Sequence, residues 1–178
     1  MSLVWKFPGG YESLDVGDAG VVISGSGKVM LISETSSIKW SVEGNFHLAK
    51  IWEGCVMAAE GEEILCLAVE DGSEIWKKKL DGKVSEIELG EKAYVGTESG
   101  TVYAFNRAGK VLWEYRIGKK VKGIKVRGKV YVLTDEELLC LSEESPKPFM
   151  SFQPPEQESP EELSGEGEWI PGMDGIYG

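Results

Sequence analysis

The chain of 178 residues is long enough to bury one hydrophobic core, and its apolar fraction of 42% excludes a wholly disordered protein. Its net charge of −11 is uneven, because residues 1–145 carry 18 basic and 23 acidic side chains, whereas residues 146–178 carry Lys147 and seven acids. The 23 glycines are about twice the usual share and indicate many turns and short strands. We therefore expect an all-β protein with an acidic tail.

The three cysteines indicate a reducing compartment. Cys55, Cys66 and Cys140 are odd in number and lack CxxC spacing, so we expect reduced core residues and neither a disulfide scaffold nor a zinc site. The start MSLVWKFPGG lacks the apolar segment of a signal peptide, and no window approaches 18 consecutive apolar residues. We expect a cytoplasmic protein without membrane contact. Scarce Asn and Gln beside abundant Glu and Lys indicate a thermophile.

An internal repeat of about 36 residues runs through most of the chain. Trp5, Trp40, Trp76 and Trp113 are separated by 35, 36 and 37 residues. The last three tryptophans end the phrases VMLISETSSIKW, ILCLAVEDGSEIW and VYAFNRAGKVLW, and each phrase overlaps an upstream hairpin pattern. A fourth copy, KVYVLTDEELLCLS, follows. Apolar runs rich in Val, Ile and Tyr, bounded by Gly, Ser and Asp, predict four short strands in each repeat, which is one blade of a β-propeller.

The third repeat carries a family phrase. AYVGTESGTVYAFNRAGKVLW (residues 93–113) resembles VYVGT-x-G-x-VYALD-x-x-GK-x-LW, the pattern of PQQ-like (quinoprotein-type) propeller repeats, which are WD40-like in architecture. The resemblance covers roughly residues 3–145. It implies that Trp40, Trp76 and Trp113 dock between neighbouring blades, each burying on the order of 200 Å².

The turns and small residues of the repeats also align. Gly72 and Gly109, before their tryptophans, are expected to supply a turn with positive φ, and Ser36 and Ser145 hold that position in less regular turns. A small residue is expected near each crowded blade centre, at Cys66, Ala104 and Cys140.

We predict a β-propeller of four PQQ-like blades in residues 1–149, followed by an irregular acidic tail in residues 150–178. Prolines interrupt the outermost strand of the fourth blade, whereas LVWKF is an outer strand without a blade, so the simplest arrangement has the Trp5 strand complete blade four. Three arrangements are then possible. The chain closes alone as a four-bladed ring, or it joins a second chain head to tail in an eight-bladed ring with exchanged Trp5 strands. In the third arrangement, its open blade face docks on another protein. We favour the dimer, because it leaves no edge free.

Motifs for catalysis or metal binding are missing from the sequence. His47 has no partner at ligand spacing and is expected to be a solvated or hydrogen-bonded strand residue, and SGSGK (residues 24–28) reads as a hairpin turn. Quinone-dependent dehydrogenases of this family carry a vicinal cysteine pair and a calcium site, but no two cysteines are adjacent here. We therefore expect no enzyme activity, cofactor or metal.

A basic stretch could bind an acidic partner. Nine basic residues lie between Arg107 and Lys129, with Glu114 as the one acid, and strand alternation places Lys125 and Arg127 on one face. The predicted stripe comprises Arg116, Lys119, Lys120, Lys122, Lys125, Arg127 and Lys129. It would contact the phosphates of RNA or DNA, or an acidic protein; the alternative is an ordinary solvated face.

The tail resembles a flexible spacer that ends in a docking peptide. SFQPPEQESPEELSGEGE is too polar to fold alone, and the WIPGMDGIYG that follows it is apolar. The candidate partner-binding residues are Trp169, Ile170, Pro171, Met173, Ile176 and Tyr177; the alternative is a frayed terminus. Our first hypothesis is a non-catalytic scaffold that joins a homodimer or heteromeric complex. The alternative is an RNA-, DNA- or ribosome-associated factor that binds through the basic stripe.

Overall fold

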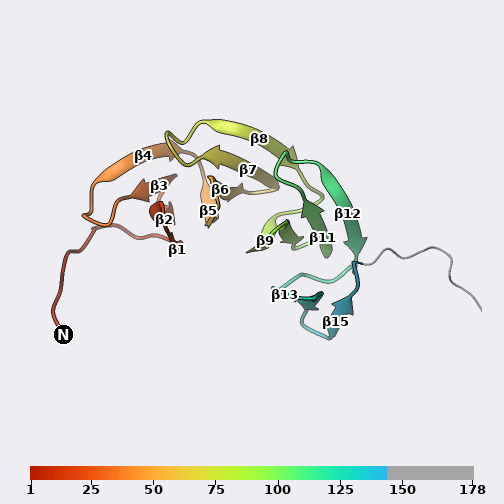
Figure 1. The fold of residues 1–178 in the computed structure, drawn as a ribbon. Coiled ribbons are helices and arrows are strands. Elements are labelled where there is room, and N and C mark those ends of the chain that lie inside the picture. The colour runs from red at the N-terminus through yellow and green to blue at the C-terminus, as the bar shows by residue number, and fades with distance from the viewer. Residues whose placement is uncertain (144–178) are drawn as a thin grey trace, which may run out of the picture. The chain divides into compact units, whose positions relative to one another are not determined.

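The computed structural model describes residues 1–143, and all of its regular elements are antiparallel β-strands. Within the compact unit Met1–Cys140, four sheets follow one another in chain order (Figure 1). Blade 1 consists of β1 (Ser13–Gly17), β2 (Gly20–Gly25), β3 (Lys28–Ile32) and β4 (Ile38–Glu43). Blade 2 consists of β5 (Phe46–Trp52), β6 (Cys55–Glu60), β7 (Glu63–Ala68) and β8 (Glu74–Lys79). Blade 3 consists of β9 (Val84–Leu89), β10 (Ala93–Thr97), β11 (Thr101–Phe105) and β12 (Val111–Arg116). Blade 4 consists of β13 (Gly123–Arg127), β14 (Lys129–Leu133) and β15 (Leu138–Leu141).

Each blade packs face to face against the next one in the chain. The innermost strands β1, β5, β9 and β13 contact one another in that order. We call the side that meets the following blade the forward face and the side that meets the preceding blade the backward face. The two central strands of blades 2 and 3 are buried on both sides, because each of these blades has a neighbour on each face.

The hydrophobic core consists of separate layers between blades. One layer joins the forward face of blade 1, through Val22 and Leu31, to Ala58 and Leu65 on the backward face of blade 2. The next layer joins the forward face of blade 2 to the backward face of blade 3; its buried members include Met57, Ile64, Cys66, Ile87, Val95, Tyr103 and Phe105. Alternate residues of each strand therefore serve two different layers, as the period of two in a strand requires.

Two of the three repeated tryptophans, Trp40 and Trp76, link one blade to the next, as the sequence predicts. Trp40 on β4 donates its indole N–H to the backbone oxygen of Val69 in blade 2 at 2.9 Å, and Trp76 on β8 donates to the oxygen of Arg107 in blade 3 at 3.0 Å. Gly72, at φ 79°, lies directly under the Trp40 ring, where a Cβ atom would approach ring carbons to 2.7 Å. The glycine is therefore needed both for its backbone conformation and for the close approach of the indole.

The Trp5 strand pairs with no strand of its own blade 4 among the described residues, so the expected completion of blade 4 within one chain is not observed, and its exchange with a second chain stays a prediction. Trp5 donates its indole N–H to the oxygen of Glu34 in blade 1 at 2.9 Å, and Phe7 and Tyr11 pack on the backward face of the same blade. Blade 4 has three strands in the described residues, so it lacks the fourth strand that the Trp5 strand was expected to provide. The turn at Ser36 has a φ of 69°, close to that of the glycine turns.

The predicted tail, residues 150–178, and the turn at Ser145 lie outside the described residues. In the described part of the chain, no helix is long and apolar enough to cross a membrane.

Candidate functional site: the two end faces of the blade series

The forward face of blade 4 is apolar and exposed. The segment KVYVLT of blade 4 aligns with KAYVGT of blade 3, which makes Tyr131 the counterpart of Tyr94. The Tyr131 side chain is 38% exposed, whereas Tyr94 is 4% exposed and Met57, its counterpart in blade 2, is fully buried. On the same face Leu133 is 46% exposed and Leu138 is 68% exposed. These side chains occupy core positions of the repeat, but no blade formed by the described residues lies in front of them.

The backward face of blade 1 shows the same pattern. Leu14 on β1 pairs with Ile23, in the register that pairs Ala49 with Ala58, Ile87 with Val95 and Ile124 with Val132 in the other blades. Leu14 is 66% exposed, whereas the equivalent Ala49, Ile87 and Ile124 are at most 1% exposed. The internal repeat thus provides its own control, because equivalent positions are buried where another blade packs on them and exposed at the two ends of the described blade series.

Residues 5–11 cover the outer part of the blade 1 face. Phe7 and Tyr11 pack against Ile23, Met30 and Ile32, which are almost fully buried as a result. The rest of the backward face, towards the innermost strand, stays open at Leu14 and at Val16, which is also 66% exposed.

Two cysteines lie in the core as expected, and the third does not. The buried Cys66 thiol donates to the Cys55 sulfur at 2.8 Å. This hydrogen bond raises the pKa of Cys66, and burial raises it further. Cys140 is exposed, which corrects the prediction that all three are core residues. It alternates on β15 with Leu139 and therefore shares the forward face of blade 4 with Leu138, which no blade of the described residues covers.

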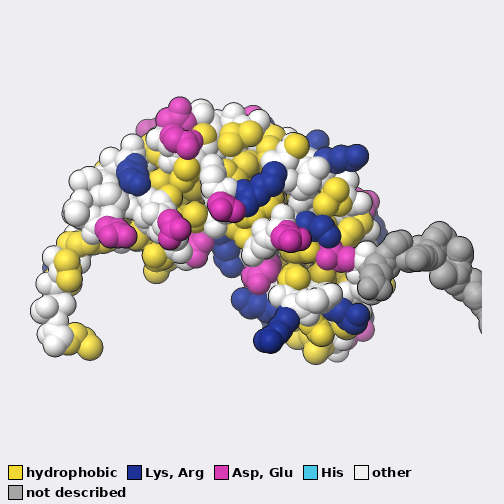
Figure 2. Space-filling view, in the orientation of Figure 1, with side chains coloured by type: hydrophobic (Ala, Val, Ile, Leu, Met, Phe, Trp, Pro, Cys, Tyr) yellow, Lys and Arg dark blue, Asp and Glu magenta, His cyan; other side chains and the backbone are white. Residues whose placement is uncertain are grey.

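The basic stripe is interleaved with acids from other elements. Five of its seven members form ion pairs: Arg116 with Asp81, Lys119 with Glu136 and Glu137, Lys120 with Glu98, Lys122 with Asp135, and Lys125 with Glu88. Arg127 and Lys129 have no ion-pair partner among the described residues. The hydrogen bond to Glu136 raises the pKa of Lys119. Figure 2 shows basic and acidic side chains mixed over this part of the surface. Nucleic-acid binding by the stripe stays a prediction from the sequence.

A depression of about 360 Å³ lies between the start of β5, the start of β9 and the connection from β12 to β13. Its lining includes His47, Lys83, Lys120 and Lys122, with Glu98 as its one acid. The His47 ring contacts the Val84 oxygen at 2.8 Å, so His47 is a hydrogen-bonded strand residue as predicted. The described residues contain no group of three or more His, Cys, Asp or Glu side chains placed to hold a metal ion.

Glu86, on the innermost strand of blade 3, is a half-buried acid at the junction with blade 4. Burial raises the pKa of its carboxyl, and this effect outweighs the attraction of Lys50 and Lys125. A carboxyl whose pKa is raised in the folded state destabilises that state once pH exceeds its unfolded pKa, and the loss is complete above the folded pKa.

We therefore expect Glu86→Gln to raise the free energy of unfolding at pH 7, because the amide removes a half-buried charge yet keeps an oxygen for the Ile124 N–H. The gain should vanish at about pH 3, well below the ordinary glutamate pKa of about 4.3, where the carboxyl is protonated in both the folded and the unfolded state. Urea unfolding of both proteins at the two pH values measures this difference. A gain of equal size at both values would contradict the assignment to charge burial.

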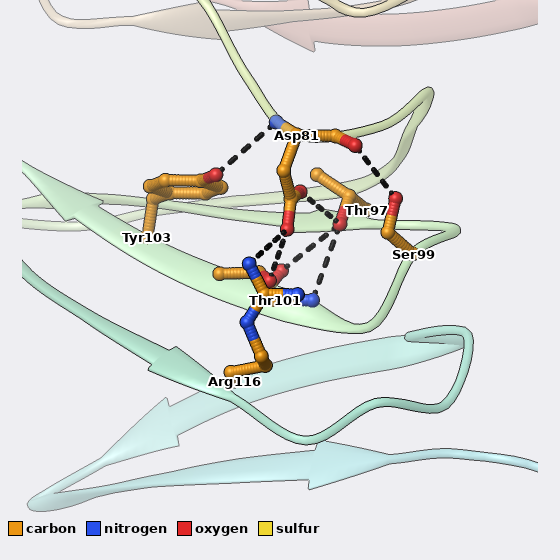
Figure 3. Close-up of polar contacts among 6 residues, drawn as sticks. All are labelled: Asp81, Thr97, Ser99, Thr101, Tyr103 and Arg116. Atoms are coloured by element: carbon orange, nitrogen blue, oxygen red, sulfur yellow. Dashed lines mark hydrogen bonds and ion pairs between the residues drawn. The ribbon is translucent and has the colours of Figure 1, made fainter.

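Asp81 organises a polar network at the edge of blade 3 (Figure 3). Its carboxylate accepts hydrogen bonds from Thr97, at 3.0 Å, and from Thr101, and it forms an ion pair with Arg116 at 3.5 Å. Its backbone N–H donates to the Tyr103 hydroxyl oxygen, and its backbone oxygen accepts from Ser99. Both threonines are buried, so the carboxylate satisfies two core hydroxyls. Both carboxylate oxygens are engaged in structural contacts, and sequence reasoning missed this role because the partners come from three strands.

These faces and layers define the class of protein as a β-propeller built from repeated blades. The family model described as outer membrane protein assembly factor BamB, of the PQQ-like repeat type, matches residues 3–119 and 60–145. The chain therefore belongs to the PQQ-like, BamB-type propeller family, which confirms the resemblance inferred from the repeats.

Solved structures agree on the fold. BamB from Moraxella catarrhalis is 14% identical, with a TM-score of 0.62, and the match covers 72% of this chain and 41% of that one. The computationally designed Ika4 protein is 10% identical, with a TM-score of 0.67, over 77% of this chain and 94% of that one. The designed Ika8 protein is 11% identical, with a TM-score of 0.67, over 74% and 45%. The chain thus spans about two fifths of the BamB chain. No curated protein sequence matches it.

Proposed function

We propose that this protein is a non-catalytic propeller scaffold that binds a protein partner through the forward face of blade 4. The observation that carries this proposal is the exposure of Tyr131, Leu133 and Leu138 at positions that are core in the other blades. A contiguous apolar sheet face is uncommon on soluble monomers and is typical of protein–protein contact sites. The family's description as an assembly factor supports a role within a multiprotein complex.

The chemistry of the face suits a folded protein better than a small ligand. It is the side of a sheet and not a pocket, and its centre is aromatic and aliphatic. Arg127, on the adjoining strand β13, is exposed and has no ion-pair partner among the described residues, so it places positive charge at the inner rim of the face. An apolar centre with a charged rim is the composition of protein interfaces.

A photo-reactive amino acid at position 138 tests the proposal. Placed at Leu138 in the full chain and irradiated in the producing cells, it should form a covalent adduct with a polypeptide. The matched control is Ile75, which is 55% exposed on the outer strand of blade 2 and belongs to neither end face. An adduct yield at position 138 no higher than at position 75 would contradict the proposal.

The tail supplies a second contact in this proposal. The apolar terminal residues, from Trp169 to Tyr177, would anchor a partner beyond the acidic spacer. Deleting residues 150–178 should leave the thermal unfolding of the propeller unchanged and reduce partner capture. Equal capture by both chains would remove the tail from the proposal. The cytoplasmic location and the thermophilic origin stay predictions.

A further inference from the structure

We infer that the partner on the forward face of blade 4 is a second copy of this chain, and that two copies close one eight-bladed ring. In each copy the Trp5 segment, residues 3–7 (LVWKF), then lies beside the partner's strand β15, as the outermost strand that blade 4 does not have among the described residues. This inference rests on the proposed function and names its partner.

Trp5 contacts blade 1 in the same way that Trp40 of blade 1 contacts blade 2 and Trp76 of blade 2 contacts blade 3. Trp40 and Trp76, on the outermost strands of blades 1 and 2, each donate to a backbone oxygen in the turn before the outermost strand of the following blade. Trp5 donates to Glu34, in the corresponding turn of blade 1, at 2.9 Å. The Trp5 segment therefore lies where the outermost strand of a blade preceding blade 1 would lie.

The residues after Trp5 follow the path of an interblade connection. Between Trp76 and β9 the chain passes from the outermost strand of blade 2 to the innermost strand of blade 3, and Leu80 joins the core layer on the way. Between Trp5 and β1 the chain makes the corresponding passage, and Tyr11 packs against Met30, the counterpart of Tyr103. Residues 5–12 thus join blade 1 to a blade that would stand before it.

In the described part of the chain, blade 4 has no outermost strand. Its described strands end at β15, and two prolines follow in the sequence, at positions 146 and 148, where the other blades have their outermost strand. An unpaired strand edge in a sheet attracts another strand. One copy offers a strand without a blade, and another copy offers a blade without that strand.

The end faces match each other for the same reason. Each junction inside the chain joins a forward face to the backward face of the next blade, and Leu14 and Tyr131 belong to the two faces that are left over. Joining blade 4 of one copy to blade 1 of the other, twice about a two-fold axis, uses both leftover faces of both copies. The match covers 41% of the BamB chain and 45% of the Ika8 chain but 94% of the Ika4 chain, so propellers of this fold include chains about twice as long as this one and chains of about its own length.

Light scattering on the purified full chain tests this inference, together with two single-charge variants. Leu14→Glu alters the backward face of blade 1, and Leu138→Glu alters the forward face of blade 4; both side chains are exposed in the single chain, so both variants should fold. Ile75→Glu is the matched control off both faces. We expect a mass twice the 19.5 kDa of one chain for the native protein and the control, and the mass of one chain for each end-face variant, with unchanged circular dichroism.

Mixing the two end-face variants sharpens the test. A mixed ring contains one native junction and one junction that carries both substitutions, so the mixture should recover part of the dimer that neither variant forms alone. A native chain that stays monomeric, whether as a closed four-bladed ring or awaiting another protein, would overturn the inference. A dimer that survives both Leu14→Glu and Leu138→Glu would overturn it as well. If the native chain is monomeric but position 138 still cross-links to another protein, the proposed function stands and the second-copy partner fails.

Discussion

Replacing Trp40 with alanine should lower the free energy of unfolding by about 3–5 kcal/mol, the range for deleting a large buried aromatic side chain. The Trp40 ring is 7% exposed, packs in the layer between blades 1 and 2, and lies against Gly72. Its indole N–H also satisfies the Val69 oxygen, which would be left without this donor. The substitution therefore opens a cavity and breaks a polar link at the same junction.

Urea unfolding of Trp40→Ala, followed by circular dichroism, measures the loss. Trp40→Phe is the control, because it keeps most of the apolar volume and removes the N–H donor, and it should cost about 1–2 kcal/mol. A loss below about 1 kcal/mol for the alanine variant would show that the tryptophan does not hold the blades together, and the assigned blade register would be wrong.

Replacing Asp81 with alanine should cost about 2–3 kcal/mol, because two buried threonine hydroxyls lose their charged acceptor. Thr97 is fully buried and Thr101 is 2% exposed, so water does not replace the carboxylate readily at either hydroxyl. The ion pair with Arg116 contributes little of this cost, since the arginine side chain is largely exposed.

Asp81→Asn separates the hydrogen bonds from the charge. The amide keeps one oxygen acceptor and can donate to a threonine oxygen, so it should cost clearly less than the alanine variant. Thermal unfolding of both proteins checks the order. Equal losses would mean that the network depends on the negative charge and not on satisfied hydroxyls, and a neutral alanine variant would contradict the network altogether.

The sequence predicts the blades because the information is local and repeated. The spacing of Trp40, Trp76 and Trp113 and the turn glycines define each unit, and the structure confirms the strands within it. An apolar residue that aligns with a buried residue of another blade is also predicted to face a neighbouring blade. Tyr131 aligns with the buried Tyr94, which identifies it as a core residue of a layer that the single chain does not complete.

The sequence could not predict features that depend on contacts between segments far apart in the chain. The docking of Trp5 on blade 1 is set by a backbone oxygen, and any residue type provides that acceptor. The ion pairs of the basic stripe use acids such as Asp81 and Glu88, which lie outside the stretch that looked uniformly positive. Cys140 aligns with core positions, but its exposure depends on whether a blade follows it.

The reactivity of Cys140 tests most directly whether the forward face of blade 4 is covered in solution. Cys55 and Cys66 are buried, and Cys140 alone among the three cysteines is exposed in the single chain, so a maleimide reports on this face without any substitution. We predict that the alkylation rate of Cys140 falls steeply as the protein concentration rises through the range in which dimers form. A rate that is independent of concentration and equal to that of the unfolded chain would contradict a covered face and, with it, the ring closed by two copies.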